Sequence, residues 1–169
     1  MTDHYRNLVD VVRNNLENQQ DWTDVRVHSD GTDGHPRILL TGLPPRRMYI
    51  HPDEQIAILK AERSLASGQR IPQPPEYEWV LPVHLTETPS VSLFAAVFDS
   101  ITALPRHDLL SDEGASVDSD GIDGIDSNDQ WTQWRGPKRA KRLLLAVVQD
   151  DSSIVYYFMH DGIVKPRQN

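Results

Sequence analysis

The sequence of 169 residues contains no cysteine, and no apolar run in it approaches the roughly 20 residues that a membrane helix needs. The absence of cysteine excludes a disulfide framework and a thiolate zinc site. The absence of a long apolar run argues against membrane insertion, and the first ten residues carry no signal-like apolar stretch. We therefore expect a soluble intracellular protein.

The sequence also lacks the motifs of several enzyme classes. It has no Gly-x-Ser-x-Gly elbow, no Gly-x-Gly-x-x-Gly loop and no phosphate loop, and none of its seven histidines forms a helical zinc motif. A run from Asp118 to Asp129 resembles a calcium loop in length. However, Ile122 stands at the fifth, ligand position and Asp123 at the sixth, where the turn requires glycine. These absences predict a protein without a metal or a cofactor.

The net charge of −8 comes largely from one segment. Residues 111–129 contain seven acids, no base and no aromatic residue, so this stretch cannot bury enough apolar area to offset the entropy of ordering it. We interpret residues 108–133 as an acidic, disordered insertion within a single domain that spans residues 1–169. The rest of the chain is then nearly neutral.

Apolar periodicity predicts three helices and a set of short strands. The first helix is indicated by a stripe at helical spacing, made of Tyr5, Leu8, Val9, Val12 and Leu16. A second helix begins at Pro52 and stops before Gly68, and a third begins at Thr88 and Pro89 and stops before Pro105. Strands are predicted at 24–28, 37–40, 46–50, 77–85, 143–148 and 154–159, with Pro82 placing its strand at a sheet edge.

The last two strands are apolar on both faces. The five residues from Gln149 to Ser153 join them, which predicts an antiparallel hairpin. A hairpin open to water on one side would alternate apolar and polar residues, so both faces here must be covered. The third helix can cover one face. Either the first helix of the same chain or a partner chain can cover the other.

A basic run follows the acidic segment and allows two interpretations. Trp131 and Trp134 could stack on RNA bases while nearby cations meet phosphates, the candidates being Lys138, Arg139, Lys141 and Arg142. The alternative is that the tryptophans anchor the end of the insertion and the bases form a solvated strand entry or a nuclear-import patch.

The C-terminal residues resemble a known family. The segment Lys141–Tyr157, followed by His160–Pro166, strongly resembles the C-terminal hairpin of the tRNA-splicing endonuclease family. Its most specific part is Ser153-Ile154-Val155-Tyr156-Tyr157 followed by Asp161-Gly162. The likeness is greatest to the smallest, non-catalytic subunit of the fungal enzyme, and it covers nearly the whole chain outside residues 106–136.

The resemblance implies an α/β fold of the mixed α+β kind. We expect a single tRNA-endonuclease-like domain with a mixed sheet, flanking helices and a C-terminal antiparallel hairpin. The family enzyme is a heterotetramer of two catalytic and two structural subunits that removes introns from precursor tRNA. The implied location is the nucleus, with the cytoplasm or an organelle surface as alternatives.

The resemblance also bears on catalysis. Catalytic subunits of the family cut RNA without metal through a Tyr, a His and a Lys. Lys141 stands about where that Lys would, but the acidic stretch before it, where the Tyr and the His should lie, contains neither residue. A lone lysine could only stabilise developing negative charge. We therefore expect a non-catalytic structural subunit. The alternatives are an active metal-independent RNA endonuclease subunit and a stand-alone RNA-binding module.

The resemblance finally implies how the chain meets its partners. Family members pair through their C-terminal strands, and an acidic loop between the last two strands enters a basic cleft of a catalytic subunit. We expect catalytic and structural subunits as partners, precursor tRNA reached through the complex, and a homodimer when the chain is isolated. The predicted interface consists of Asp150, Asp151, Ile154, Tyr156, Phe158 and Val164.

Overall fold

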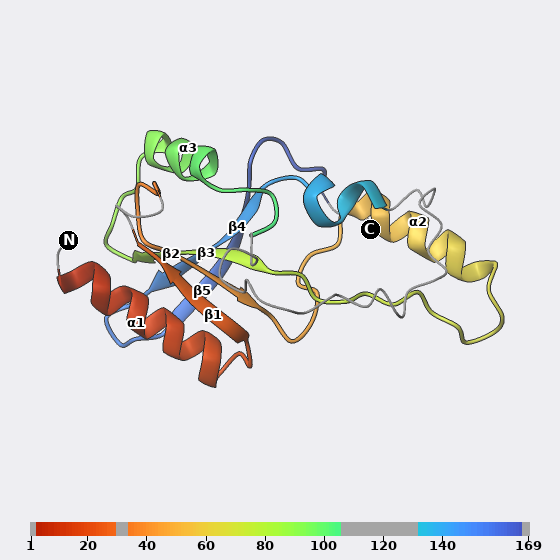
Figure 1. Ribbon diagram of the computed structural model, residues 1–169, viewed down its shortest axis with the longest axis horizontal. Coiled ribbons are helices and arrows are strands. Elements are labelled where there is room, and N and C mark those ends of the chain that lie inside the picture. Colours follow the sequence, from red (N-terminus) through yellow and green to blue (C-terminus); the bar gives the residue numbers. More distant parts are fainter. Residues whose placement is uncertain (1–2, 30–33, 106–131, 167–169) are drawn as a thin grey trace, which may run out of the picture.

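The computed structural model describes residues 3–29, 34–105 and 132–166, which form one mixed sheet flanked by helices (Figure 1). The helices are α1 (Asp3–Asn18), α2 (Pro52–Arg63) and α3 (Val91–Ser100), with two short 3₁₀ turns, η1 (Thr132–Trp134) and η2 (Gly136–Lys138). The strands are β1 (Thr23–His28), β2 (Leu39–Leu43), β3 (Glu78–His84), β4 (Arg142–Val148) and β5 (Ile154–His160). The predicted mixed α+β class is confirmed.

The five strands lie in the order β1-β2-β3-β4-β5. The β1–β2, β2–β3 and β4–β5 pairs are antiparallel, whereas β3 and β4 are parallel. The predicted C-terminal hairpin is confirmed, with a register that runs from Arg142 opposite His160 to Val148 opposite Ile154. Among the described residues, β5 pairs with β4 alone and is therefore an edge strand.

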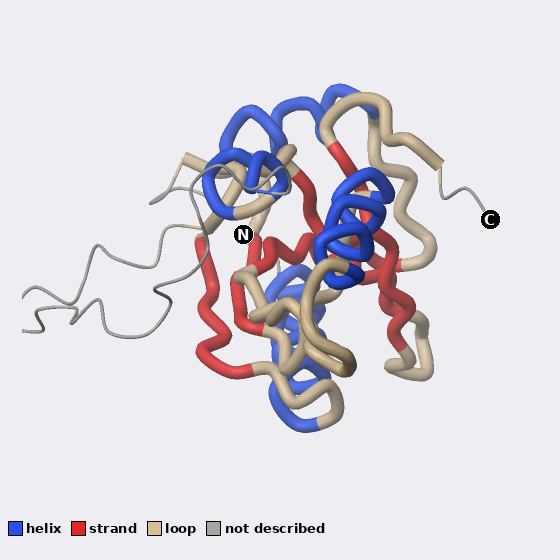
Figure 2. The backbone as a smooth tube through the Cα atoms, turned by 90° about the vertical axis from the view of Figure 1, so that its right-hand side faces the viewer, coloured by secondary structure: helices blue, strands red, loops and turns tan. Residues whose placement is uncertain are grey.

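The two faces of the sheet are covered by different helices, and Figure 2 shows the strands between them. α1 packs its apolar stripe on one face, because alternate strand residues such as Leu40, Val80 and Leu144 point toward it. α3 packs Val97 and Phe98 on the other face, against the intervening strand residues. α2 projects from one end of the sheet, beside η1 and η2 (Figure 1).

Two predictions about the strands are wrong. Residues 46–50 form no strand, since β2 runs through Gly42 and ends at Leu43. Pro82 lies in β3, which is a central strand and not an edge. The β2–β3 ladder ends at Val80, two residues before Pro82. Beyond it, the Pro82 carbonyl accepts a hydrogen bond from the Arg37 side chain. Proline has no backbone N–H to donate, and at this position the β2–β3 ladder does not need one.

Most of the predicted acidic insertion at 108–133 lies outside the described residues, as do Trp131 and the segment 106–131 as a whole. Within the described part of the chain, no helix combines the length and the apolar character needed to cross a membrane.

Candidate functional site

The α1 face of the edge strand β5 is covered by the chain itself. Ile154, Tyr156 and Phe158 are half-buried and pack against the α1 cluster. The Tyr156 hydroxyl donates a hydrogen bond to Asn15 Oδ1 at 2.7 Å, and burial raises the pKa of Tyr156 above its ordinary value. The first helix of the same chain, α1, therefore covers this face of β5, as one of the two alternatives predicted.

The opposite face of β5 is left open. Val155 is 40% exposed and Tyr157 is 55% exposed, because α3 lies over the β3 side of the sheet and does not reach them. The sequence pattern identified the hairpin as apolar on both faces but assigned the interface to Ile154, Tyr156 and Phe158. The structure instead places the most exposed apolar side chains of β5 on the other face.

Val164, the remaining apolar residue of the predicted interface, lies on the segment after β5. Gly162 turns the chain there with a φ of +98°, which a residue with a Cβ rarely adopts. Ile163 beyond it is fully exposed, and Lys165 forms an ion pair with Asp53 at 2.7 Å.

A small cavity of about 90 Å³ lies against this segment and is lined in part by Tyr49, His51, Trp134, His160 and Val164. His160 Nε2 is buried there and has no hydrogen-bond partner in the part of the chain that the structure describes. Burial lowers the pKa of His160, and the nearby Arg142 guanidinium adds to this effect. His160 is therefore neutral near pH 7 and adds no positive charge to this cavity.

The turn between β4 and β5 presents its two acids to solvent. Asp150 has a side chain that is 91% exposed, and its Oδ1 lies 3.0 Å from His84 Nε2. Asp151 Oδ1 accepts a hydrogen bond from the Ser153 N–H at 3.0 Å. Hydrogen bonds from the side chain and backbone of Ser153 hold the pKa of Asp151 below its ordinary value, so the carboxyl is ionised at neutral pH.

The basic run before β4 is largely buried. Arg139 and Arg142 are each 3% exposed, and both guanidinium groups bind the buried Glu78. Arg142 Nε lies 3.1 Å from Glu78 Oε2, and Arg139 Nη1 lies 2.9 Å from Glu76 Oε2. Burial alone would raise the pKa of Glu76, but hydrogen bonds from the Gly136 N–H and Arg139 outweigh it and lower that pKa.

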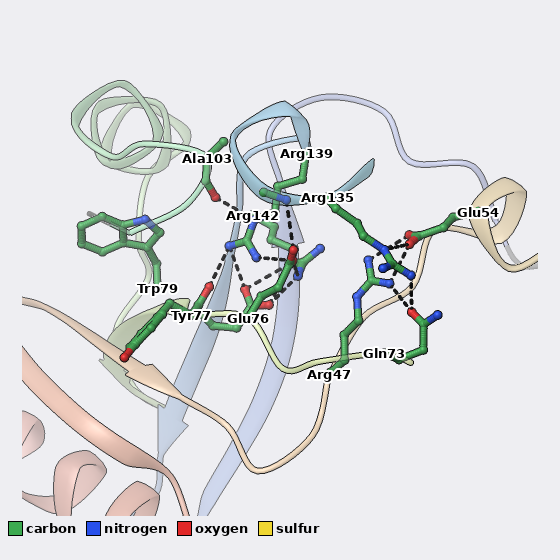
Figure 3. Close-up of polar contacts among 12 residues, drawn as sticks. Arg47, Glu54, Gln73, Glu76, Tyr77, Trp79, Ala103, Arg135, Arg139 and Arg142 are labelled. Carbon is green, nitrogen blue, oxygen red and sulfur yellow. Dashed lines mark hydrogen bonds and ion pairs between the residues drawn. The ribbon is translucent and has the colours of Figure 1, made fainter. Parts of the chain in front are cut away.

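A second cluster ties η1 and η2 to α2. Arg47 and Arg135 both bind the fully buried carboxylate of Glu54, at 2.6 Å and 3.0 Å, and both donate to the side-chain oxygen of Gln73 (Figure 3). Each acid in the two clusters thus neutralises buried arginines, and the arginines connect segments that are far apart in sequence.

These contacts argue against RNA binding by Arg139 and Arg142, because neither guanidinium can reach a phosphate without breaking buried ion pairs. Lys141 is half-buried and donates to the Phe98 carbonyl at 2.9 Å. Of the four candidates only Lys138 is exposed. An acid at the start of an apolar strand, Glu78, was the sequence signal that these arginines are buried, and it was missed. The parallel β3–β4 register sets Glu78 beside Arg142.

No three histidine, aspartate or glutamate side chains come together as metal ligands within residues 3–29, 34–105 and 132–166. The described site offers three features for contact with another protein: the strand edge of β5, the exposed apolar pair Val155 and Tyr157, and the acidic turn.

Sequence comparison defines the class of protein to which this fold and this surface belong. The chain matches the family described as Sen15 protein over residues 11–121 and 124–169, and it therefore belongs to that family. The resemblance inferred from the C-terminal motifs is thereby confirmed.

Individual relatives make the assignment more specific. The chain is 55% identical over 166 residues to the probable tRNA-splicing endonuclease subunit tsp-1 of Neurospora crassa, covering 98% of this chain and 67% of the relative. It is 28% identical to the probable tRNA-splicing endonuclease subunit sen15 of Schizosaccharomyces pombe, over 98% of this chain and 85% of the relative. It is 26% identical to the tRNA-splicing endonuclease subunit SEN15 of Eremothecium gossypii, over 96% and 91%.

Proposed function

We propose that this chain is a non-catalytic, structural subunit of a tRNA-splicing endonuclease and supports intron removal from precursor tRNA by pairing with a catalytic subunit. Membership of the Sen15 family and the names of its relatives support the role in tRNA splicing. The observation that carries the structural role is the edge strand β5, which has an open apolar face and begins directly after an exposed acidic turn.

A free strand edge is suited to pairing with another chain. The seven residues of β5 present backbone N–H and C=O groups on the side away from β4, and a partner strand can extend the sheet there. The same partner would cover Val155 and Tyr157. Ile154, Tyr156 and Phe158 retain part of their exposure and stay at the rim of the proposed interface. In the absence of a catalytic subunit, a second copy of this chain is the proposed occupant, which gives a homodimer.

The acidic turn completes the proposed contact. Asp150 and Asp151 point into solvent at the tip of the hairpin. In a heterotetramer made of two dimers, they can enter a basic cleft on the catalytic subunit of the other dimer. Charge complementarity at such a contact contributes to both specificity and association rate.

The proposal gives the chain no chemical step. Lys141 is engaged by the Phe98 carbonyl, and acid–base cleavage of RNA also needs a general base and a general acid close to the lysine. The purified chain is therefore expected not to cut precursor tRNA. Metal-independent cleavage that survives repurification and is lost on Lys141→Ala would show that the chain is a nuclease.

The interface is tested by changing the open face of β5. A Val155→Asp/Tyr157→Asp variant should still fold, because both side chains are solvent-exposed, yet should fail to co-purify with the catalytic subunits. Ile56→Asp/Leu59→Asp is the matched control, since these α2 residues are each 49% exposed and lie outside the proposed interface. Co-purification of the β5 variant at the wild-type level would refute pairing through this strand.

A further inference from the structure

The acidic turn is tied to the end of β3, an element that lies outside the hairpin. The Leu85 N–H donates to the Val148 carbonyl at 2.9 Å, directly before the turn, and His84 Nε2 lies 3.0 Å from Asp150 Oδ1. Within the turn, the Gln149 N–H donates to the Ser153 carbonyl at 2.9 Å. Asp150 is thus held from outside the turn, whereas Asp151 is held from within it.

The His84 ring is itself fixed. Its side chain is 15% exposed, and its Nδ1 accepts hydrogen bonds from the hydroxyl and the N–H of Thr86, at 2.8 Å and 3.3 Å. With Nδ1 acting as acceptor, the proton of the neutral ring lies on Nε2, which therefore donates to Asp150. Because the His84 ring is already fixed, it loses little conformational entropy when it donates to Asp150. The contact therefore mainly orders the Asp150 carboxylate.

We propose that His84 is a positioning residue that holds Asp150, and with it the Gln149–Ser153 turn, in the conformation that a cationic cleft of the partner subunit recognises. This inference rests on the proposed function, in which that turn docks.

The geometry explains why positioning would matter. Asp150 Oδ1 contacts His84 and Asp151 Oδ1 accepts the Ser153 N–H, yet both residues are exposed, so their carboxylates remain accessible to lysine or arginine groups of the partner. A turn that is ordered before docking avoids part of the entropy cost of ordering it in the complex.

The positioning is first tested in the isolated, full-length chain. His84→Ala should leave the melting temperature nearly unchanged and should speed the hydrogen exchange of the Ser152 and Ser153 amides by about two- to fivefold, the range expected for one exposed charge-assisted hydrogen bond. His84→Gln is the conservative variant, because the glutamine amide places an N–H near the position of Nε2. It should restore slow exchange. Unchanged exchange in His84→Ala would overturn the positioning role.

The consequence for assembly is tested with reconstituted catalytic subunits. His84→Ala should weaken tetramer formation by a similar two- to fivefold factor, and His84→Gln should restore it. In an Asp150→Ala background, His84→Ala should have no further effect, since the histidine acts through that carboxylate. A full additional loss in this background would overturn the proposed route.

One more variant separates this inference from the proposed function. Asp150→Lys/Asp151→Lys should prevent tetramer assembly, whereas Asp10→Lys/Asp99→Lys, with the same change in net charge at exposed positions on α1 and α3, should not. If the turn variant blocks assembly but His84→Ala does not weaken it, the positioning role fails and the docking function stands. If the turn variant assembles normally, the docking function fails, and both proposals fall.

Discussion

Glu78 is the acid whose replacement should reveal most about how the two parallel strands are held. Its side chain is 1% exposed and accepts hydrogen bonds from Arg139 and Arg142, which are themselves buried. Glu78→Gln keeps the shape of the side chain but removes its charge. Two buried guanidinium groups then lose their shared counter-ion.

The expected cost follows from the burial of both arginines. Removing one partner of a buried ion pair destabilises a protein by roughly 3–5 kcal/mol. Glu76 Oε2 remains 2.9 Å from Arg139 and 3.5 Å from Arg142 and supplies part of the lost charge, so we expect the lower end, about 3 kcal/mol. For a chain of this length, this corresponds to a fall in melting temperature of roughly 6–12 °C.

Urea denaturation followed by tryptophan fluorescence measures this loss, with Trp79 in the same strand as the reporter. Glu17→Gln is the matched control, because Glu17 pairs with Arg13 at 3.1 Å on the surface of α1, with side chains 37% and 49% exposed. That substitution should cost at most about 0.5 kcal/mol. If Glu78→Gln destabilised the protein no more than Glu17→Gln, the buried network would contribute nothing to holding β3 against β4.

Three further predictions concern stability. The pKa of Glu76 is lowered in the folded state, so its contribution to stability is complete above the ordinary value of 4.5 and is lost as the pH falls through the folded pKa. Urea midpoints measured across this range should therefore fall more for the wild type than for Glu76→Gln, and parallel curves would contradict this. Gly42→Ala should destabilise the protein by about 1–3 kcal/mol, because its Cβ would lie 2.8 Å from Cε3 of Trp22. Tyr156→Phe should cost about 0.5–1.5 kcal/mol through loss of the bond to Asn15, and thermal melts that match the wild type would show that this bond is not formed in solution.

The sequence by itself determined the local elements and the family. The helical stripe of α1, the start of α2 at Pro52 and the apolar C-terminal hairpin are readable from local side-chain patterns, because periodicity is set by the geometry of each element alone. The start of α3 was predicted less well, since its cap is Ser90 and not Thr88. The C-terminal motif led to the correct family, because it is a contiguous run of residues and can be recognised without knowledge of the fold. The acidic turn was also readable, because it lies between two recognisable strands.

Only the tertiary structure decided which surfaces are open and which charges are buried. Periodicity shows that β5 has two apolar faces, but α1 covers Tyr156 and leaves Tyr157 exposed because of where the helices cross the sheet. The arginines before β4 looked like a basic patch in the sequence. They are structural because the parallel pairing of β3 and β4, which are separated by 57 residues, sets Glu78 against Arg142. Such pairings depend on long-range register, which the local pattern around either residue does not encode.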